Sequence, residues 1–293
     1  MLRGICLVDK PLGVSSHHVV SRARRALGTK KVGHAGTLDP AATGLLVLGV
    51  GAGTRLLTYL VGLGKTYHAT MRLGYATTTD DAEGERIDVP GGDLSTCTPE
   101  AIEAALTPYR GVISQVPSTF SAIKVDGKRA YDLAREGKEV ALASREITVY
   151  RLTGAILEVT PDYIDVDLEV DCSSGTYIRA LARDIGRDLG VGGHLVALRR
   201  ISVGPFELEN AGEVDDLEES SLLPLAMAAS KVMPSVDLVP DQVNDIQHGR
   251  SVSCPGVEQN VPLAALDGAT GELVAIIECA GERSRILMGV PTS

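Results

Sequence analysis

The stretch YIDVDLEVDCSSGTYIR, residues 163 to 179, decides which fold the sequence predicts. Apolar and acidic residues alternate through its first half, a pattern typical of a β-strand with one buried and one solvated face. The predicted buried face consists of Ile164, Val166, Leu168, Val170 and Cys172, and the predicted solvated face consists of Asp165, Asp167, Glu169 and Asp171. Beyond Gly175 the apolar period becomes helical, and one side of the predicted helix carries Ile178, Leu181, Ile185 and Leu189 before Gly190 ends it. A strand, a turn and a helix in direct succession indicate a mixed α/β body.

The first 110 residues repeat this mixture of strands and helices. The run TYHATMRLG, residues 66 to 74, alternates with period two, which should turn Tyr67 inward. The run SSHHVVSRARRALG, residues 15 to 28, predicts a helix with a serine cap and a glycine stop, and Thr98 before Pro99 predicts another helix start. Hairpin-like spacing also occurs, so we expect an α+β fold with a mixed, mostly antiparallel sheet flanked by helices.

An acidic segment from about residue 207 to 235 marks the expected domain boundary. The run VPLAALDGATGELVAIIECAGERSRILMGV that follows, residues 261 to 290, has short β-rich runs separated by turn dipeptides. We expect one large domain over residues 1–235 and a small β-rich domain over residues 236–293. Residues 1–72 carry ten Lys or Arg and two acids, which fits either a surface for a polyanion or an ordinary solvated face.

Composition excludes several classes of protein. The chain has 293 residues, of which 44% are hydrophobic, but no stretch reaches the ~18 to 20 apolar residues of a membrane helix and no signal peptide is evident. We therefore expect a soluble, cytoplasmic protein. The five cysteines are widely spaced without a C-x-x-C pair, so we expect buried reduced thiols and no zinc site. The glycine-rich runs GLGKT, residues 62 to 66, and GVGAGT, residues 49 to 54, both miss the spacing of nucleotide-binding motifs.

The stretch GHAGTLDPAATGLL, residues 33 to 46, contains a single acid. Asp39 followed by Pro40 has the pattern of a helix cap with proline at the first helical position. Against that interpretation, the four residues before Gly44 are too few for a helix, and the glycines at 33 and 36 allow close approach of a bulky group. His34 adds a second polar side chain to the same stretch. On these residues alone, both a structural cap and a functional carboxylate remain open.

This stretch resembles the active-site motif of the TruB family of pseudouridine synthases, bacterial enzymes that isomerise uridine 55 in the TΨC loop of tRNA. Further motifs of that family occur in the same order: LVDKP (7–11), KTY (65–67), PSTFSAIKVDGKRAYDLAREG (117–137), CSSGTYIRAL (172–181) and HLVALRR (194–200). Together these motifs cover residues 4 to about 205. The resemblance implies the pseudouridine synthase fold and a PUA-like C-terminal domain.

The resemblance also implies roles for individual residues. Asp39 matches the catalytic aspartate, Tyr67 the tyrosine that packs on the target base, and Arg179 the arginine that pairs with the aspartate. His34 matches the histidine that helps receive the flipped nucleotide, and Leu198 the leucine beneath the base. The segment 118–138 resembles an insertion that folds over the tRNA loop. The remaining implied substrate-binding residues are Lys10, Gly36, Thr37, Lys65, Tyr177, Lys124, Lys128 and Arg129.

The implied reaction breaks the N1–C1′ bond of uridine and rejoins the base through C5, so we expect neither a cofactor nor a metal. Asp39 can act as a nucleophile or as a base, and a planar, always charged Arg179 would favour its ionised form. The expected partner is the TΨC stem-loop of tRNA, bound by a monomer that flips the target base. Two alternatives are a non-catalytic tRNA-binding or folding module and a guide-dependent RNA pseudouridine synthase.

Overall fold

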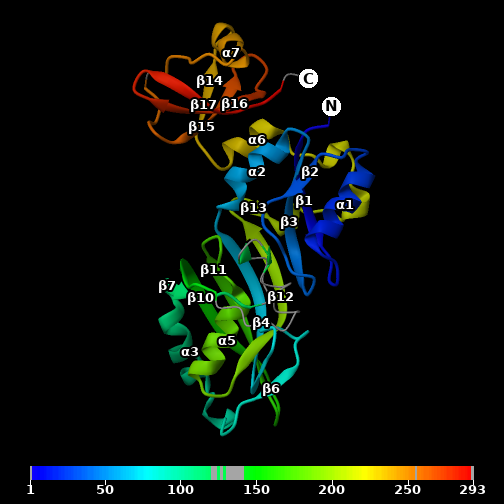
Figure 1. Cartoon of the computed structure of the whole chain (residues 1–293), viewed down its shortest axis with the longest axis vertical. Coiled ribbons are helices and arrows are strands. Elements are labelled where there is room, and N and C mark those ends of the chain that lie inside the picture. The colour runs from blue at the N-terminus through cyan, green and yellow to red at the C-terminus, as the bar shows by residue number, and fades with distance from the viewer. Residues whose placement is uncertain (1, 120–123, 126–127, 130–141, 255, 292–293) are drawn as a thin grey trace. The chain divides into compact units, whose positions relative to one another are not determined.

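The computed structural model describes residues 2–119, 124–125, 128–129, 142–254 and 256–291. The chain forms two compact units, whose elements are labelled in Figure 1. The first unit comprises residues 1–40, 44–62 and 203–293, and the second comprises residues 41–43 and 63–202. Each unit is therefore assembled from more than one stretch of sequence.

The second unit is built on a sheet with the strand order β12–β4–β11–β10–β7 (Figure 1). The pairs β4–β11, β11–β10 and β10–β7 are antiparallel. These strands are β4 (Lys65–Leu73), β7 (Gly111–Gln115), β10 (Arg145–Val159), β11 (Ile164–Cys172) and β12 (Gly193–Val203). Two short hairpins join β5 (Tyr75–Thr77) to β6 (Arg86–Asp88) and β8 (Lys124–Val125) to β9 (Lys128–Arg129). The expected mostly antiparallel sheet is confirmed.

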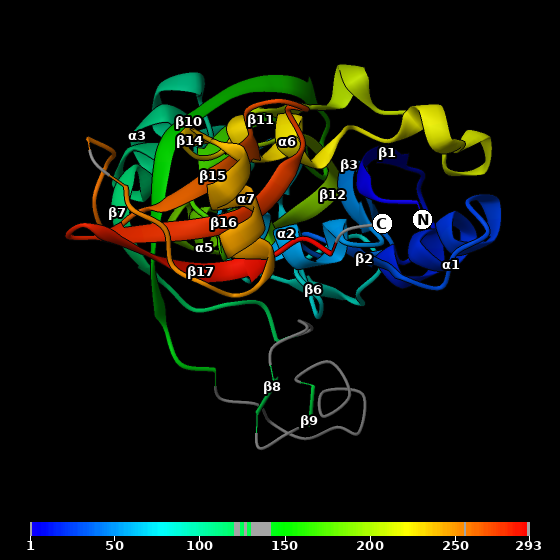
Figure 2. The same ribbon diagram turned by 90° about the horizontal axis from the view of Figure 1, so that it is seen from above.

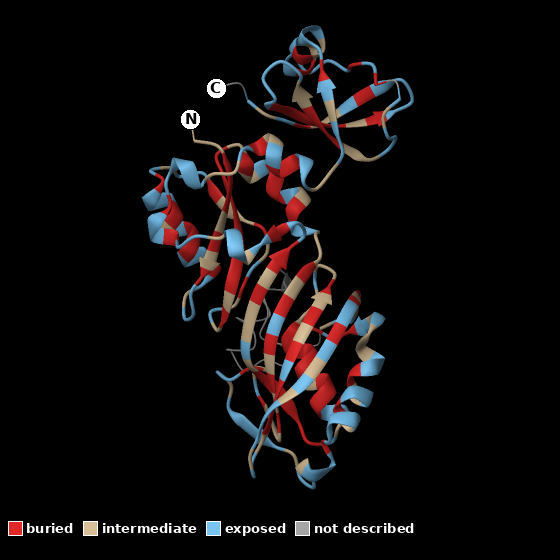
Figure 3. Ribbon diagram, turned by 180° about the vertical axis from the view of Figure 1, so that it is seen from behind, coloured by how far each residue is buried: buried red, intermediate tan, exposed pale blue. Residues whose placement is uncertain are grey.

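Two helices, α3 (Pro99–Leu106) and α5 (Ile178–Asp188), pack on one face of this sheet (Figure 1). The helices pack there because the side chains of β4 and β11 that were predicted to face the core are buried. Buried and more exposed residues alternate along the strands in Figure 3. Thr98 caps α3 by accepting a hydrogen bond from the Ala101 amide. After α5 the chain turns at Gly190, whose φ of +74° lies in the left-handed region that favours glycine.

One acid of the predicted solvated face is instead covered. Asp165 is 6% exposed and forms a two-point ion pair with Arg72, with both N–O distances 2.8 Å. The Arg72 guanidinium also stacks 3.6 Å from the ring centre of Tyr163. Because a planar cation satisfies both carboxylate oxygens, the acid can be buried at low cost. The prediction of a solvated Asp165 was therefore wrong, although its face of the strand was assigned correctly.

In the first unit, β1 (Gly4–Lys10) and β2 (Val32–His34) each pair antiparallel with β3 (Ala42–Val50). Ser15 caps α1 (Ser16–Ala26), whose apolar stripe packs into a core with β1 and β3. A segment from much later in the chain packs against β1, since Ile5 and Leu223 exchange two backbone hydrogen bonds of 2.9 and 2.7 Å. The unit also contains α2 (Gly53–Val61), β13 (Phe206–Glu207) and α6 (Leu225–Ser230).

The C-terminal residues of the first unit form a sheet of their own. Its strand order is β14 (Ser235–Leu238), β15 (Pro262–Asp267), β16 (Leu273–Ala280) and β17 (Arg283–Gly289), with only the β14–β15 pair parallel. Helix α7 (Pro240–Gln247) packs across this sheet (Figure 2). The expected small β-rich C-terminal domain is thus present.

A disulfide joins Cys254 to Cys279 in this domain, with a Cα–Cα distance of 6.3 Å. The expectation of reduced thiols was wrong for this pair and holds for Cys6, Cys97 and Cys172, which are free and buried. The two cysteines meet because Ser253 forms a β-bridge with Arg283, at the start of β17, while Cys279 lies opposite Ser284 on the same strand. No described helix is both long and apolar enough to span a membrane.

Candidate active site

Asp39 lies in an irregular loop between β2 and β3 of the first unit. The chain makes a single turn at Pro40 and enters β3 at Ala42, so no helix follows Asp39. The helix-cap interpretation is therefore excluded. Gly36 has a φ of +99°, a backbone conformation that a side chain would strain. Asp39 is half-buried, as are His34 and Gly36, while Thr37 is exposed.

Hydrogen bonds hold the backbone on both sides of Asp39. The Ser16 hydroxyl donates to the Leu38 carbonyl at 2.9 Å and accepts from the Leu38 amide at 2.8 Å. On the other side, the Pro40 carbonyl accepts a 2.9 Å hydrogen bond from the Gly13 amide. Loss of the Ser16 hydroxyl would leave two buried backbone groups of Leu38 without a partner, which is costly. The carboxylate is thus carried by a fixed backbone.

Lys10 belongs to the same support. Its side chain is fully buried, and Nζ donates to the carbonyls of Pro11, Val14 and Pro40 at 3.0, 2.7 and 3.5 Å. A buried ammonium needs such partners because burial removes its water. These bonds bind the end of β1 to the turn after Asp39. The ring of His34 contacts the ring of His17 edge-on at 5.7 Å.

Three further candidate residues lie on the sheet of the second unit. Tyr67 on β4 is 8% exposed, which confirms the predicted inward orientation of its side chain. Its backbone lies opposite Val170 of β11. Lys65, at the start of β4, is buried and donates to the Leu63 carbonyl at 2.8 Å. Burial lowers the pKa of Lys65 to about 8, and Arg200 adds to this lowering. Leu198 is half-buried on β12, and its carbonyl accepts from the Thr43 hydroxyl at 3.5 Å.

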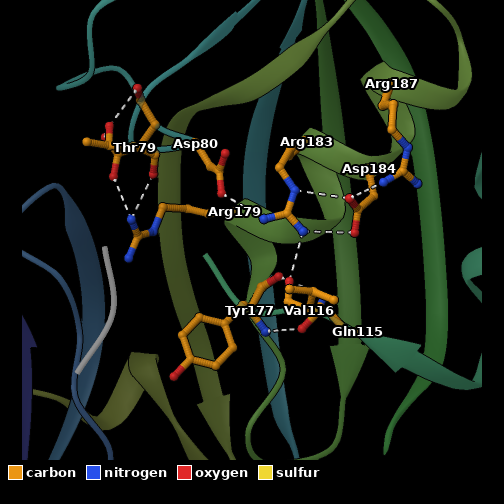
Figure 4. Close-up of polar contacts among 10 residues, drawn as sticks. Thr79, Asp80, Gln115, Val116, Tyr177, Arg179, Arg183, Asp184 and Arg187 are labelled. Atoms are coloured by element: carbon orange, nitrogen blue, oxygen red, sulfur yellow. Dashed lines mark hydrogen bonds and ion pairs between the residues drawn. The ribbon is translucent and has the colours of Figure 1, made fainter. Parts of the chain in front are cut away.

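Arg179, in the first turn of α5, is held by residues that the sequence did not single out (Figure 4). Its Nη1 donates to the Thr79 carbonyl at 2.9 Å and to Asp81 Oδ2 at 3.2 Å. The side chains of this pair are 8% and 11% exposed. The other oxygen of Asp81 accepts from the Thr79 hydroxyl and from the Glu83 amide, the latter at 3.1 Å. Asp81 therefore fixes the guanidinium from a loop about one hundred residues earlier in the chain.

Tyr177 immediately precedes α5, and its backbone is tied to the end of β7. Gln115 accepts from the Tyr177 amide at 2.9 Å and donates to the Tyr177 carbonyl at 3.0 Å. The Tyr177 ring lies 5.4 Å from the guanidinium of Arg145. Lys124, Lys128 and Arg129 are described only as backbone of the β8–β9 hairpin, and most of the expected insertion at 118–138 lies outside the described residues.

Each unit carries candidate groups with chemistry of its own. The first unit contributes a carboxylate on a fixed loop, and the second contributes a buried tyrosine, an arginine with a fixed orientation and a half-buried leucine. A carboxylate can act as an acid, a base or a nucleophile, and a fixed guanidinium can stabilise a negative charge. Among the described residues, no group of three or more His, Cys, Asp or Glu side chains is placed to hold a metal ion.

Comparison with known proteins identifies the class. Residues 24–178 match the sequence model of the TruB family pseudouridylate synthase N-terminal domain, and residues 179–231 match that of the tRNA pseudouridylate synthase B C-terminal domain. The chain belongs to the TruB family of pseudouridine synthases. Among its relatives, tRNA pseudouridine synthase B of Arthrobacter sp. (strain FB24) is 48% identical over 306 residues, covering 100% of this chain and 98% of the relative. The enzyme of that name from Thermobifida fusca (strain YX) is 51% identical, covering 92% of each chain.

Solved structures show the same fold. The chain aligns with a protein in an H/ACA RNP bound to a substrate RNA containing 2′-deoxyuridine, with a TM-score of 0.71, 26% identity, and 98% and 85% of the two chains covered. It aligns with an archaeal box H/ACA sRNP Nop10–Cbf5 complex at a TM-score of 0.70 and 26% identity, over 98% and 86% of the chains. The resemblance inferred from the sequence motifs is thereby confirmed.

Proposed function

We propose that this protein converts uridine 55 in the TΨC loop of tRNA to pseudouridine, with Asp39 as the catalytic carboxylate. The observation that carries the proposal is the Asp39 loop, whose backbone is fixed on both sides by Ser16, Gly13 and Lys10. A catalytic group must be held within a fraction of an ångström of its target, and such support provides that. The relatives named tRNA pseudouridine synthase B supply the substrate class.

In this proposal the target uridine leaves the RNA stack and enters the site. Tyr67 packs on the flipped base, Leu198 lies beneath it, and Arg179 pairs with Asp39 and keeps it ionised. His34, Gly36 and Thr37 receive the nucleotide from the loop side. Asp39 acts as nucleophile or base while the N1–C1′ bond breaks and the C5–C1′ bond forms. The C5 proton is lost and N1 gains one, so the isomerisation needs no net oxidation.

Other parts of the chain contribute to binding in our proposal. Lys10 acts through the loop that it supports, whereas Lys65 and Tyr177 line the substrate side of the site. Lys124, Lys128 and Arg129 of the insertion at 118–138 neutralise tRNA phosphates. We further propose a catalytic domain over residues 1–235, a PUA-like domain over 236–293, and a monomer that acts in the cytoplasm, where its tRNA substrate is found.

The decisive experiment measures loss of the C5 hydrogen. An unmodified tRNA transcript labelled with tritium at uracil C5 is incubated with the protein alone, and release of tritium to water is followed over time. We expect release at a single uridine, and none from a transcript with cytidine at position 55. Absence of release would favour a binding or folding module, and release only after addition of a guide RNA would favour a guide-dependent enzyme.

Asp39→Asn tests the catalytic role with a matched control. The amide is almost isosteric but can neither attack nor accept a proton as a carboxylate does, so turnover should disappear. Binding of tRNA should change less than about tenfold, which corresponds to about 1.4 kcal/mol. Asp167→Asn makes the same change at an exposed carboxylate on β11 and should leave turnover intact. Near-normal turnover in Asp39→Asn would remove Asp39 from the mechanism.

A further inference from the structure

Helix α5 carries a row of three arginines, of which the sequence motifs single out only the first. Arg179, Arg183 and Arg187 are spaced four residues apart and therefore lie along one side of the helix. Figure 4 shows this row with acidic side chains beside it. The middle arginine, Arg183, contacts Asp80, Val116 and Asp184.

Arg183 connects three separate segments of the second unit. Its Nη1 donates to Asp80 Oδ2 at 3.1 Å and its Nη2 to the Val116 carbonyl at 2.8 Å. Its Nε and Nη2 also donate to the two oxygens of Asp184, on α5 itself, at 3.0 and 3.2 Å. Four of the five N–H donors of the guanidinium are thus used within the protein. This geometry makes Arg183 a fixed connector and leaves little of it for an RNA phosphate.

Three consecutive residues engage two successive turns of α5. Thr79 and Asp81 hold Arg179, while Asp80 between them holds Arg183. The Asp80 carbonyl also accepts from the Leu195 amide of β12 at 3.1 Å. The side chain of Asp80 is only 13% exposed and that of Arg183 is 26% exposed. A tripeptide anchored at two points along a helix cannot rotate about either point alone.

The Val116 carbonyl, which Arg183 also holds, lies next to a second contact with the start of α5. Val116 follows Gln115, whose side chain bonds both backbone groups of Tyr177. Arg183 therefore fixes one end of the same short segment whose other end is fixed to the residue before α5. Removal of the Arg183 contacts would loosen the segment 79–81 and the segment 115–116 together.

We propose that Asp80 and Arg183 are positioning residues for the reaction: their ion pair sets the orientation of the segment 79–81 and thereby aims the Arg179 guanidinium at the catalytic carboxylate. The inference rests on the role of Arg179 proposed above. Without the pair, Thr79 and Asp81 still contact Arg179, but the segment that carries them can tilt. The rate of the chemical step then falls, whereas association with tRNA does not.

The test compares three variants with the whole protein in the tritium-release assay. Asp80→Asn removes the charge of one partner, and Asp80→Asn/Arg183→Gln removes both charges, so that no buried ion is left alone. Arg187→Gln is the control, because Arg187 lies on the same helix face and pairs with Asp184 and Asp188 but contacts neither Asp80 nor Val116. We expect kcat to fall at least tenfold in Asp80→Asn with KM for tRNA within twofold. The double variant should be no slower than Asp80→Asn, and Arg187→Gln should match the original protein.

Three results would overturn the inference. One is an unchanged kcat in both Asp80 variants while their unfolding temperature falls, which would make the pair structural only. Another is an equal loss of kcat in Arg187→Gln. The third is a rise in KM with a shallower salt dependence of tRNA binding in the double variant, which is the sign of a lost phosphate contact. Arg179→Lys distinguishes failure of this inference from failure of the proposed role of Arg179. If Arg179→Lys is slow while Asp80→Asn has a normal kcat, only this inference fails. If Arg179→Lys has a normal kcat, the proposed role of Arg179 fails.

Discussion

The support of the Asp39 loop can be tested at Ser16, which does not touch the proposed substrate site itself. Ser16→Ala removes one hydroxyl that is 1% exposed and that bonds both the amide and the carbonyl of Leu38. Leu38 is also buried, so water cannot replace the lost partner. Two backbone groups next to Asp39 then lack hydrogen bonds.

The magnitude follows from those two groups. A buried polar group without a partner costs about 1 to 3 kcal/mol, so two of them should lower the free energy of unfolding by about 2 to 6 kcal/mol. Alanine has a better helix propensity than serine, which offsets up to about 0.5 kcal/mol at this position in α1. The loop should relieve the remaining cost by shifting, and this shift moves Asp39. We therefore expect kcat to fall at least tenfold even under conditions where the variant is fully folded.

The assay combines denaturant unfolding with tritium release at saturating tRNA. Ser21→Ala is the matched control, because it makes the same substitution in α1 at an exposed serine whose hydroxyl bonds the His17 carbonyl. The control shares the gain in helix propensity but not the lost loop contacts. The reasoning is refuted if Ser16→Ala and Ser21→Ala have the same stability within 0.5 kcal/mol, a limit of roughly the propensity term, and the same kcat.

Three more predictions follow from the site and the C-terminal domain. Arg179→Lys should lower kcat at least about tenfold, since a flexible ammonium lacks the planar, fixed geometry of the guanidinium; steady-state tritium release measures this, and an unchanged kcat would contradict it. The pKa of Lys65, about 8 when folded, lies below its ordinary value of 10.5, so the unfolded chain binds more protons between these values and stability rises with pH. Lys65→Met should abolish this rise of about 2 kcal/mol between pH 8 and 10 in urea unfolding, and an unaltered pH dependence would count against it. Alkylation of the denatured, unreduced protein should modify three of the five cysteines, because Cys254 and Cys279 are joined. Reduction should expose five and cost about 3 kcal/mol of stability for a loop of this length, and five reactive thiols without reductant would disprove the bond.

Local patterns in the sequence predicted the elements that position the site. The alternation in β4 and β11 depends only on which face meets the core, so Tyr67 was correctly turned inward. The helical period after Gly175 likewise predicted α5 and its end at Gly190. The pattern around Asp39 left two interpretations open, and only the coordinates of the backbone after Pro40 excluded the helix cap.

Contacts between distant segments could not be predicted in the same way. Asp80 and Asp81 occur in TTTDDAEGE, residues 77 to 85, which has the polar composition of any solvated turn. Their partners on α5 lie about a hundred residues later, and no spacing rule links the two segments. The burial of Asp165 and the pairing of Cys254 with Cys279 have the same origin, because each depends on which strand or loop lies opposite. The adjacent acids Asp80 and Asp81 were the one feature of the sequence that could have indicated ion pairs with basic residues of another segment.

The end of α5 imposes a constraint on protein engineering. A side-chain carbon at Gly186 would come within 2.3 Å of the Gly193 nitrogen, so the helix and the start of β12 meet backbone against backbone. The amides of Val191 and Gly192 both donate to the Gly186 carbonyl, at 3.2 and 2.9 Å. Arg179 and Leu198, at opposite ends of this junction, are therefore parts of one cassette. Anyone transplanting Arg179 and Leu198 together into another scaffold must move residues 178–203 as a block, with the glycines unchanged.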